Sequence, residues 1–254
     1  MEQVSQKLLV VGATGSIGKR VVNVAIAEGY RVRALVRNKD KASEFDARVE
    51  VVVGQLTRWE SLTEAVEGID SIAFVHGTYG SRETAELVDY GGVRNVLTAL
   101  GKRHARIALM TTIGATDRRG SHDWKRRGEW LVRASGLPYT VVRPAWFDCN
   151  GPDEHKLLML QGDKPLTGSP KDGVISRRQL AEVLVRSLRS GASLRKTFEL
   201  HAMKGSPQDD LEPLFTALDA DTEGSLNGAH DVQNMPLEKE PATVRADIAK
   251  VLSR

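Results

Sequence analysis

The stretch LLVVGATGSIGKRVV, residues 8–22, decides the fold. A short apolar run leads directly into three glycines spaced three residues apart, and a helical pattern follows them. The first glycine of such a turn allows the tight bend, the second lets backbone N–H groups approach a phosphate, and the third lets the helix pack on the strand. The stretch therefore predicts a dinucleotide site at a helix N-terminus, where free N–H groups and the helix dipole favour an anion. The predicted contacts are the turn residues Gly12, Thr14, Gly15, Ser16, Ile17 and Gly18.

Short apolar runs alternate with longer amphipathic ones along the next part of the chain. The predicted strands are 8–13, 31–36, 49–53, 70–75, 106–111 and 139–143. They are almost continuously apolar, as expected of parallel strands that are buried on both faces. The helical patterns between them are 16–28, 58–67, 81–102 and 123–135. This alternation predicts an α/β fold, a Rossmann-type doubly wound parallel sheet.

The alternation ends after Pro144, where Gly, Pro and Asp become frequent. We expect 151–163 to form a flexible flap over the pocket, with His155 exposed. The later patterns are helices at 177–188, 211–218 and 243–252 and a strand at 197–200. Residues 1–254 are therefore predicted to form one dinucleotide-binding domain, to which 145–254 contributes a small substrate-side lobe and a C-terminal tail.

Composition excludes several classes of protein. The net charge of +3 comes from 36 basic and 33 acidic residues among 254, which is not the charge of a dedicated nucleic-acid binder. The one cysteine, Cys149, excludes an internal disulfide and fits a reducing compartment. No apolar run approaches the length of a membrane span. We expect a cytoplasmic protein that takes a small-molecule substrate and has neither a nucleic acid nor a membrane as partner.

The sequence offers no convincing metal site. Its six histidines show no metal-ligand spacing. The segment 219–230 is similar to a calcium loop, but its twelfth position is His230 and not the glutamate that such a loop requires. We interpret this segment as a turn and expect no metal.

The end of the second predicted strand indicates which dinucleotide binds. An NAD site places an acidic residue about 20 residues beyond the glycines, where it binds the ribose 2′-hydroxyl. This chain has Arg37 there, with Asn38, Lys39 and Lys41 nearby. An arginine can pair with a 2′-phosphate, so the sequence favours NADP(H) over NAD(H). The alternative is an exposed basic loop that binds no ligand.

Motifs along the first 200 residues follow the order of one known family. They are GATGSIGKRVV (12–22), RALVRN (33–38), VVVGQL (51–56), FVHGTYG (74–80), VDYGGVRNVL (88–97), MTTIGAT (110–116), KRRGEWLVRASGLPYTVVRPAWF (125–147) and ISRRQLAEVL (175–184). In this order the sequence resembles the atypical short-chain dehydrogenase/reductase family, NAD(P)H-binding proteins near the extended branch.

The resemblance implies further contacts with the cofactor. They are Gln55 and Leu56 at the adenine, His76 and Gly77 along the adenosine ribose and diphosphate, and Pro144, Ala145 and Trp146 at the nicotinamide carboxamide. Gln55 departs from the family, which has an aspartate in this motif. Its amide can still donate and accept hydrogen bonds.

The catalytic helix of the family is altered in this chain. Enzymes of the family pair a serine or threonine with Tyr-x-x-x-Lys, in which the tyrosine donates a proton and the lysine lowers its pKa. Thr111 and Thr112 match the serine region and Lys125 matches the lysine, but Ser121 stands at the tyrosine position. Lys125 is therefore interpreted mainly as a ligand of the cofactor ribose. His122 could supply a proton, although capping of the helix by Ser121 or Asp123 is favoured as the role of this segment.

Aromatic residues were weighed as pocket or core residues by their place in the pattern. Tyr79, in the loop after the fourth predicted strand, could approach a substrate. Trp124, Trp130 and Trp146 are candidates to line the pocket; Trp146 is the best placed of the three, and a structural role is favoured for Trp130. Tyr90 and Tyr139 are expected in the core because they lie on a predicted helix and a predicted strand.

Two classes of function remain open. Relatives without the tyrosine include reductases of quinones, flavins or dyes, and also sensors that bind the dinucleotide without turnover. We favour an NADPH-dependent reductase of a small conjugated or cationic acceptor; the alternative is a redox sensor or regulatory binding protein. The helix that contains 89–100 often forms a dimer face in related dehydrogenases, which predicts a homodimer.

Overall fold

The computed structural model describes residues 5–78, 81–164 and 166–253, and the candidate Tyr79 lies outside them. Its centre is a parallel sheet whose six leading strands were all predicted. They are β1 (Lys7–Val11), β2 (Arg31–Val36), β3 (Glu50–Val53), β4 (Ser71–Phe74), β5 (Arg106–Met110) and β6 (Tyr139–Pro144). Their order in the sheet is β3-β2-β1-β4-β5-β6. The chain therefore changes direction across the sheet between β1 and β4, where doubly wound folds bind their ligands.

The second half of the chain extends this sheet. Strand β10 (Lys196–Met203) pairs in parallel with β6, and β8 (Lys156–Leu160) and β9 (Val174–Ile175) pair antiparallel with β10. The short strand β7 (Trp146–Phe147) pairs with β9. The predicted flap over 151–163 is therefore wrong in its main part, because β8 belongs to the sheet and buries Leu157. His155 is exposed as predicted.

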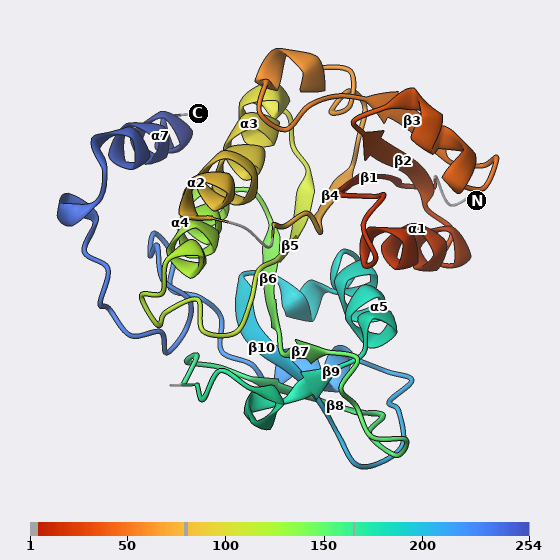
Figure 1. Cartoon of the computed structure of the whole chain (residues 1–254), viewed down its shortest axis with the longest axis vertical. Coiled ribbons are helices and arrows are strands. Elements are labelled where there is room, and N and C mark those ends of the chain that lie inside the picture. Colours follow the sequence, from red (N-terminus) through yellow and green to blue (C-terminus); the bar gives the residue numbers. More distant parts are fainter. Residues whose placement is uncertain (1–4, 79–80, 165, 254) are drawn as a thin grey trace.

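Helices cover both faces of the sheet (Figure 1). On one face lie α1 (Gly18–Ala27) and α5 (Arg177–Ser187), and on the other α3 (Gly91–Leu100) and α4 (Ser121–Ala134). Strand β1 serves both layers, because Leu8 and Val10 pack in the core cluster of α1 and α5 while Leu9 and Val11 pack in the cluster of α3 and α4. None of the described helices is long and apolar enough to cross a bilayer.

Further helices and helical turns complete the fold. They are α2 (Arg82–Thr84), α6 (Glu212–Thr216), α7 (Ala242–Leu252), the π-helical η3 (Ala85–Tyr90) and the 3₁₀ turns η1 (Lys39–Glu44), η2 (Trp59–Leu62), η4 (Pro170–Asp172), η5 (Gly191–Ser193) and η6 (Leu237–Lys239).

The helix predicted over 81–102 is interrupted by the π-helical segment η3 between α2 and α3. Such segments are rare and are frequently found at functional sites. Here the segment carries Asp89, and two glycines follow it. A Cβ on Gly92 would lie 2.7 Å from His76 Nε2, so glycine lets the His76 ring pack against the helix.

The helix predicted over 58–67 is wrong beyond its first turn. Only Trp59–Leu62 is helical, as the 3₁₀ turn η2. The turns that follow contact the buried Arg33 guanidinium, whose Nη1 donates hydrogen bonds to the carbonyls of Glu64, Ala65 and Glu67. Arg33 lies on β2, so the sequence pattern of the segment itself contains no sign of this interaction.

Helix α4 starts two residues earlier than predicted. Gly120, with φ of 44°, is its N-cap, and no side chain caps the helix. Capping by Ser121 or Asp123 is therefore wrong. Ser121 is the first helical residue, and the Asp123 carboxylate instead faces Arg118, with 3.3 Å between Oδ2 and Nη2.

The C-terminal tail packs on the α3 and α4 face. The Tyr90 hydroxyl donates to Asp247 of α7 over 2.9 Å, and Arg127 of α4 donates to Glu240 over 2.5 Å. Tyr90 is buried, as predicted. No residue of α3 is exposed. The homodimer expected through the helix that contains 89–100 stays a prediction, and a segment of the same chain lies against this layer.

Candidate functional site

A cavity of about 540 Å³ opens at the carboxyl ends of the parallel strands. Its walls come from the turn after β1, the segments after β4, β5 and β6, and helix α4. The predicted site residues that line it are Gly15, Ser16, Ile17, Gly77, Thr111, Thr112, Lys125, Pro144, Ala145 and Trp146. The fold therefore brings together predictions that came from five separate segments of the sequence.

The glycine turn has the geometry that its spacing predicts. Gly12 has φ of +94°, and a Cβ on it would lie 2.6 Å from the backbone nitrogen of His76. A Cβ on Gly18 would lie 2.1 Å from the Gly12 carbonyl oxygen, so α1 can pack on the turn only with glycine there. A Cβ on Gly15 meets only the Gly12 oxygen, at 3.3 Å, and otherwise points into open space.

The open side of this turn suits an anion. Gly15 donates its N–H to the Gly12 carbonyl over 3.0 Å. Within the described ranges the N–H groups of Ser16 and Ile17 have no acceptor, and both residues line the cavity. N–H groups at the start of a helix bind phosphate well. Thr14 is half-buried in the same turn, outside the cavity wall.

The adenine end of the predicted site lies outside the cavity, at the carboxyl ends of β2 and β3. Val36 and Val53 are partners in the sheet, which places Arg37 and the segment of Gln55 side by side. Both side chains are exposed, and neither makes a hydrogen bond or ion pair within the part of the chain that the structure describes. The Arg37 guanidinium is therefore available to an anionic ligand. Leu56 is half-buried, and its carbonyl accepts from Asn95.

Lys125 is held at the back of the cavity by a buried carboxylate. Its Nζ lies 3.4 Å from Asp89 Oδ2, and the Asp89 side chain is 2% exposed. Asp89 also accepts from the backbone N–H and the hydroxyl of Thr78, at 2.9 and 3.0 Å. An ammonium fixed in this way beside Gly77 can hold a ribose hydroxyl, as the resemblance implies.

The His76 ring lies behind the cavity wall and not in it. It borders a small void with Asp89, Thr111 and Lys125, and both ring nitrogens are buried without a hydrogen-bond partner among the described residues. Burial lowers the pKa of His76 to about 4; Asp89 acts against this shift and Lys125 adds to it. The ring is therefore neutral at physiological pH, and only the backbone of this segment can run along the cofactor.

The two predicted catalytic threonines differ in what their hydroxyls do. Thr111 is 6% exposed and donates its hydroxyl proton to Glu129 over 2.7 Å, away from the cavity. Thr112 is half-buried and donates to the Ile113 carbonyl over 3.0 Å. Of the pair, Thr112 has the hydroxyl that a ligand could redirect.

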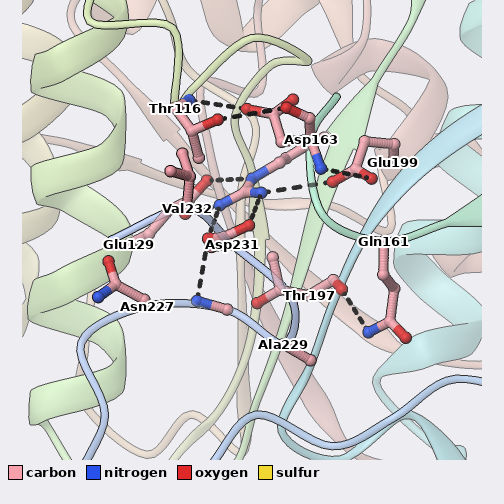
Figure 2. Close-up of polar contacts among 12 residues, drawn as sticks. Thr116, Glu129, Gln161, Asp163, Thr197, Glu199, Asn227, Ala229, Asp231 and Val232 are labelled. Atoms are coloured by element: carbon pink, nitrogen blue, oxygen red, sulfur yellow. Dashed lines mark hydrogen bonds and ion pairs between the residues drawn. The ribbon is translucent and has the colours of Figure 1, made fainter. Parts of the chain in front are cut away.

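Behind Thr111 lies a buried cluster of charges, drawn in Figure 2. Arg143 lies at its centre and is fully buried, with Glu129 Oε2 and Asp231 Oδ1 each at 2.7 Å. Glu199 Oε1 is 3.3 Å from the same guanidinium. Burial raises the pKa of Glu199 to about 7. The positive charge of Arg143 lowers this pKa, and the negative charge of Asp163 raises it.

This cluster supports the cavity wall through Asp163. Its carboxylate accepts the backbone N–H groups of Gly114 and Thr116, at 2.6 and 2.7 Å, in the loop after β5. Figure 2 shows the contact with Thr116. Asp163 donates its own N–H to Glu199 over 3.2 Å. The loop that positions Thr112 and Ile113 is therefore tied to the buried charges of β6 and β10.

His122, and not Ser121, stands on the cavity one turn before Lys125. Its Nδ1 lies 2.9 Å from the Gly114 carbonyl oxygen. Asp117 and Arg119 line the cavity beside it and pair with each other, 3.3 Å apart.

The wall of the cavity after β6 combines aromatic and apolar side chains with two charged ones. Trp146 lines it with 41% of its surface exposed, as predicted. Trp124 does not line it: the ring is 2% exposed and packs against Tyr90 and Arg127, so that prediction is wrong. Other residues of this wall were missed by the sequence reasoning, because they follow the point where the strand–helix alternation ends; they are Phe147, Leu166, Gly168, Asp172 and Arg177.

The segment 219–230 has a structural role. Asp221 is 2% exposed and accepts hydrogen bonds from Arg133, Tyr139 and Thr197. Tyr139 is buried, as predicted. In the ranges that the structure covers, no group of three or more His, Cys, Asp or Glu side chains is arranged to hold a metal ion.

Comparison with protein families identifies the cofactor class of this cavity. A family described as NAD(P)H-binding matches residues 12–190. The chain belongs to the NAD(P)H-binding family. This membership confirms the resemblance to the atypical short-chain dehydrogenases/reductases and a nicotinamide dinucleotide as cofactor. The family comprises binders of either dinucleotide, so it does not choose between NADP(H) and NAD(H).

The individual relatives share less than 30% sequence identity with this chain. Sanguinarine reductase of Eschscholzia californica is 24% identical in an alignment that covers 85% of this chain and 98% of that relative. The photosystem II assembly factor Ycf39 of Trieres chinensis is 27% identical over 208 residues, 78% of this chain and 64% of the relative. The solved structure of the anaerobillin reductase ChuY from Escherichia coli O157:H7 superposes with a TM-score of 0.63 at 21% identity, and covers 80% of this chain and 100% of ChuY.

Proposed function

We propose that this protein is an NADPH-dependent reductase of a small, conjugated organic acceptor. One observation carries the proposal: a single cavity joins the N–H groups of the glycine turn to an apolar, aromatic wall at Trp146 and Phe147. A dinucleotide that starts at the turn would place its nicotinamide toward that wall. A flat, conjugated acceptor fits between the two by stacking.

The residues of the chain would hold the cofactor from several sides. Ser16 and Ile17 supply N–H groups to the diphosphate, and Lys125 binds the nicotinamide ribose. The backbone after β6, at Pro144 and Ala145, lines the cavity where the carboxamide is expected. When bound, the dinucleotide supplies a hydride, and the protein contributes the orientation of the acceptor and the exclusion of water.

Arg37 supports NADPH over NADH. Its guanidinium is exposed and unpaired within the described ranges, at the strand end where an NAD site would carry a carboxylate. A 2′-phosphate can accept two parallel hydrogen bonds from such a group. We also propose the cytosol as its compartment, because Cys149 is the one cysteine of the chain and is free and exposed.

The missing tyrosine narrows the substrate class. Ser121 does not line the cavity, and the Thr111 hydroxyl is donated to Glu129. Conjugated acceptors spread the negative charge that the hydride brings, so they depend less on a strong proton donor than a simple ketone does. The proposal of a reductase is supported by a relative whose name states that it reduces sanguinarine.

The test is an acceptor screen that follows NADPH absorbance at 340 nm with the purified chain. A naphthoquinone, a free flavin, a cationic dye and a simple ketone would be compared. We expect turnover of the conjugated acceptors, dependent on enzyme concentration, and none of the ketone. Absence of turnover with every acceptor, despite NADPH binding, would overturn the reductase.

The second candidate is a regulatory protein that binds the dinucleotide without consuming it. It is favoured by the Thr111 hydroxyl pointing away from the cavity and by a relative named as an assembly factor. A sensor should bind the reduced and oxidised dinucleotides with different affinities. It should also leave NADPH unchanged in the acceptor screen.

A further inference from the structure

The reduction of a neutral acceptor needs a proton as well as a hydride, and the cavity has one well-placed donor. His122 lies three residues before Lys125 on α4, so the two side chains share one face of the helix. Both line the cavity. The helix thus presents an imidazole near the place where the family presents a tyrosine.

The hydrogen bond of His122 fixes how its ring is used. A backbone carbonyl can only accept, so Nδ1, which lies 2.9 Å from the Gly114 oxygen, must carry a proton. Nε2 is then the nitrogen left without a partner among the residues that the structure describes. The Gly114 N–H is in turn held by Asp163 over 2.6 Å, so the carbonyl that orients the ring belongs to an anchored loop.

Several other polar side chains of the cavity are engaged elsewhere. Lys125 pairs with Asp89, Arg119 with Asp117, and Arg177 with Asp148. The Thr111 hydroxyl donates to Glu129. His122 is the one histidine among the residues that line the cavity, and its Nε2 has no protein partner in the described ranges.

We propose that His122 is a catalytic residue, which donates a proton from Nε2 to the heteroatom of the bound acceptor. This inference rests on the proposed function. In a quinone, the hydride from the reduced nicotinamide forms the new bond to the acceptor, and the displaced π electrons move onto an oxygen. That oxygen takes the Nε2 proton of the imidazolium. The ring becomes neutral, keeps its Nδ1 proton on Gly114, and regains a proton from water; NADPH is oxidised and the quinone becomes a hydroquinone.

The test compares two acceptors that differ in their need for a proton. A quinone must gain a proton, whereas a cationic dye with a C=N⁺ bond is neutralised by the hydride alone. We expect His122→Asn to lower kcat for the quinone roughly 100-fold, the size typical of losing a general acid. KM for NADPH, and kcat for the cationic dye, should stay at the wild-type values. His155→Asn, at an exposed histidine outside the cavity, is the matched control and should change neither.

Each other result has a definite meaning. Equal losses with both acceptors would show that His122 acts on structure or cofactor position, which overturns the inference. Wild-type quinone turnover in His122→Asn overturns it as well and leaves the proposed function standing. No turnover in the wild-type protein overturns the proposed function and the inference together.

A second readout does not depend on activity. In the cofactor-free protein, ¹⁵N–¹H correlation spectra recorded over a range of pH should show that the neutral form of the His122 ring has its proton on Nδ1, with the signal assigned by its absence in His122→Asn. Addition of a non-reducible quinone analogue should shift Nε2 and leave Nδ1 almost unchanged. A neutral ring with its proton on Nε2, or no response of Nε2 to the analogue, would contradict the proposed geometry.

Discussion

Gly15→Ala should weaken the binding of NADPH and Gly18→Ala should lower the stability of the fold, although the two glycines belong to one motif. A Cβ on Gly18 would lie 2.1 Å from the Gly12 oxygen and 2.8 Å from backbone atoms of Ala13, far inside an ordinary contact of about 3.5 Å. Backbone lies on both sides, so α1 must move away from the turn. A Cβ on Gly15 has only the Gly12 oxygen nearby, at 3.3 Å, and the chain around it can stay in place.

The magnitudes follow from these contacts. Overpacking of this kind costs about 1–3 kcal/mol or more, and each kcal/mol lowers Tm by roughly 2–4 °C in a chain of this size. Gly18→Ala should therefore melt several degrees below the wild type. Gly15→Ala should melt with the wild type, but its methyl group stands where the diphosphate approaches Ser16 and Ile17. Losing one charge-assisted hydrogen bond there costs about 2 kcal/mol, which is roughly a 30-fold rise in Kd for NADPH.

The assay is thermal melting without ligand together with an NADPH fluorescence titration, on the wild type and both variants. The expected pattern is stable and binding-deficient for Gly15→Ala, and destabilised for Gly18→Ala. If Gly15→Ala bound NADPH with the wild-type Kd, the diphosphate would not lie at this turn. If Gly18→Ala melted with the wild type, the packing of α1 on Gly12 would be wrong.

Three further predictions concern the charged residues. Arg37→Ala should weaken the binding of NADPH roughly 10- to 100-fold and leave the binding of NADH almost unchanged in the same titration, because one cation facing the 2′-phosphate is lost. Equal losses of affinity for the two dinucleotides would refute that role. Lys125→Met leaves the Asp89 carboxylate buried without its cation, so we expect Tm to fall by several degrees and Lys125→Met, Asp89→Asn to regain part of the loss; a double variant no more stable than the single one would count against the pair. The Glu199 pKa of about 7 lies above its ordinary value of 4.5, so the native state holds this proton more tightly than the unfolded state. The resulting stabilisation of the native state is complete below about pH 4.5 and is lost as pH rises through 7. Between pH 5 and pH 8 the free energy of chemical unfolding should therefore fall by about 3 kcal/mol more in the wild type than in Glu199→Gln. Parallel pH dependences of the two proteins would show that the Glu199 proton is not linked to folding.

The central sheet could be predicted from the sequence because each strand is an almost continuous apolar run. Parallel strands buried on both faces must have this composition, and β1 shows it in the packing of Leu8 and Leu9 on opposite faces. The glycine turn was equally visible, since its spacing follows from backbone contacts that only glycine allows.

The errors occurred where a distant side chain decides the local structure. The carbonyls of Glu64, Ala65 and Glu67 accept hydrogen bonds from Arg33 of β2, and this pairing is not encoded in 58–67. Strand β8 was mistaken for a flap because its one partner is β10, some forty residues later in the chain. Arg143 lies in an apolar strand pattern, and only the folded chain reveals the acidic residues that bury it.

The sequence predicted which segments lie at the cavity better than it predicted the contacts of individual side chains. The threonines after β5 lie at the cavity, but the direction of the Thr111 hydroxyl depends on Glu129, which no local pattern indicates. Helix capping was favoured over a proton-donor role of His122, because the position of Gly120 as the N-cap follows from its backbone φ of 44°, which the sequence does not show. A glycine directly before a helix with no better cap was the signal available in the sequence.

The most direct test of the account is a fluorescence titration of the wild-type chain with NADPH and NADH. The account predicts saturable enhancement of NADPH fluorescence at one site per chain, with a Kd for NADH at least tenfold weaker. Absence of binding by both dinucleotides would contradict the cofactor site, and with it the reductase, the sensor and the role proposed for His122.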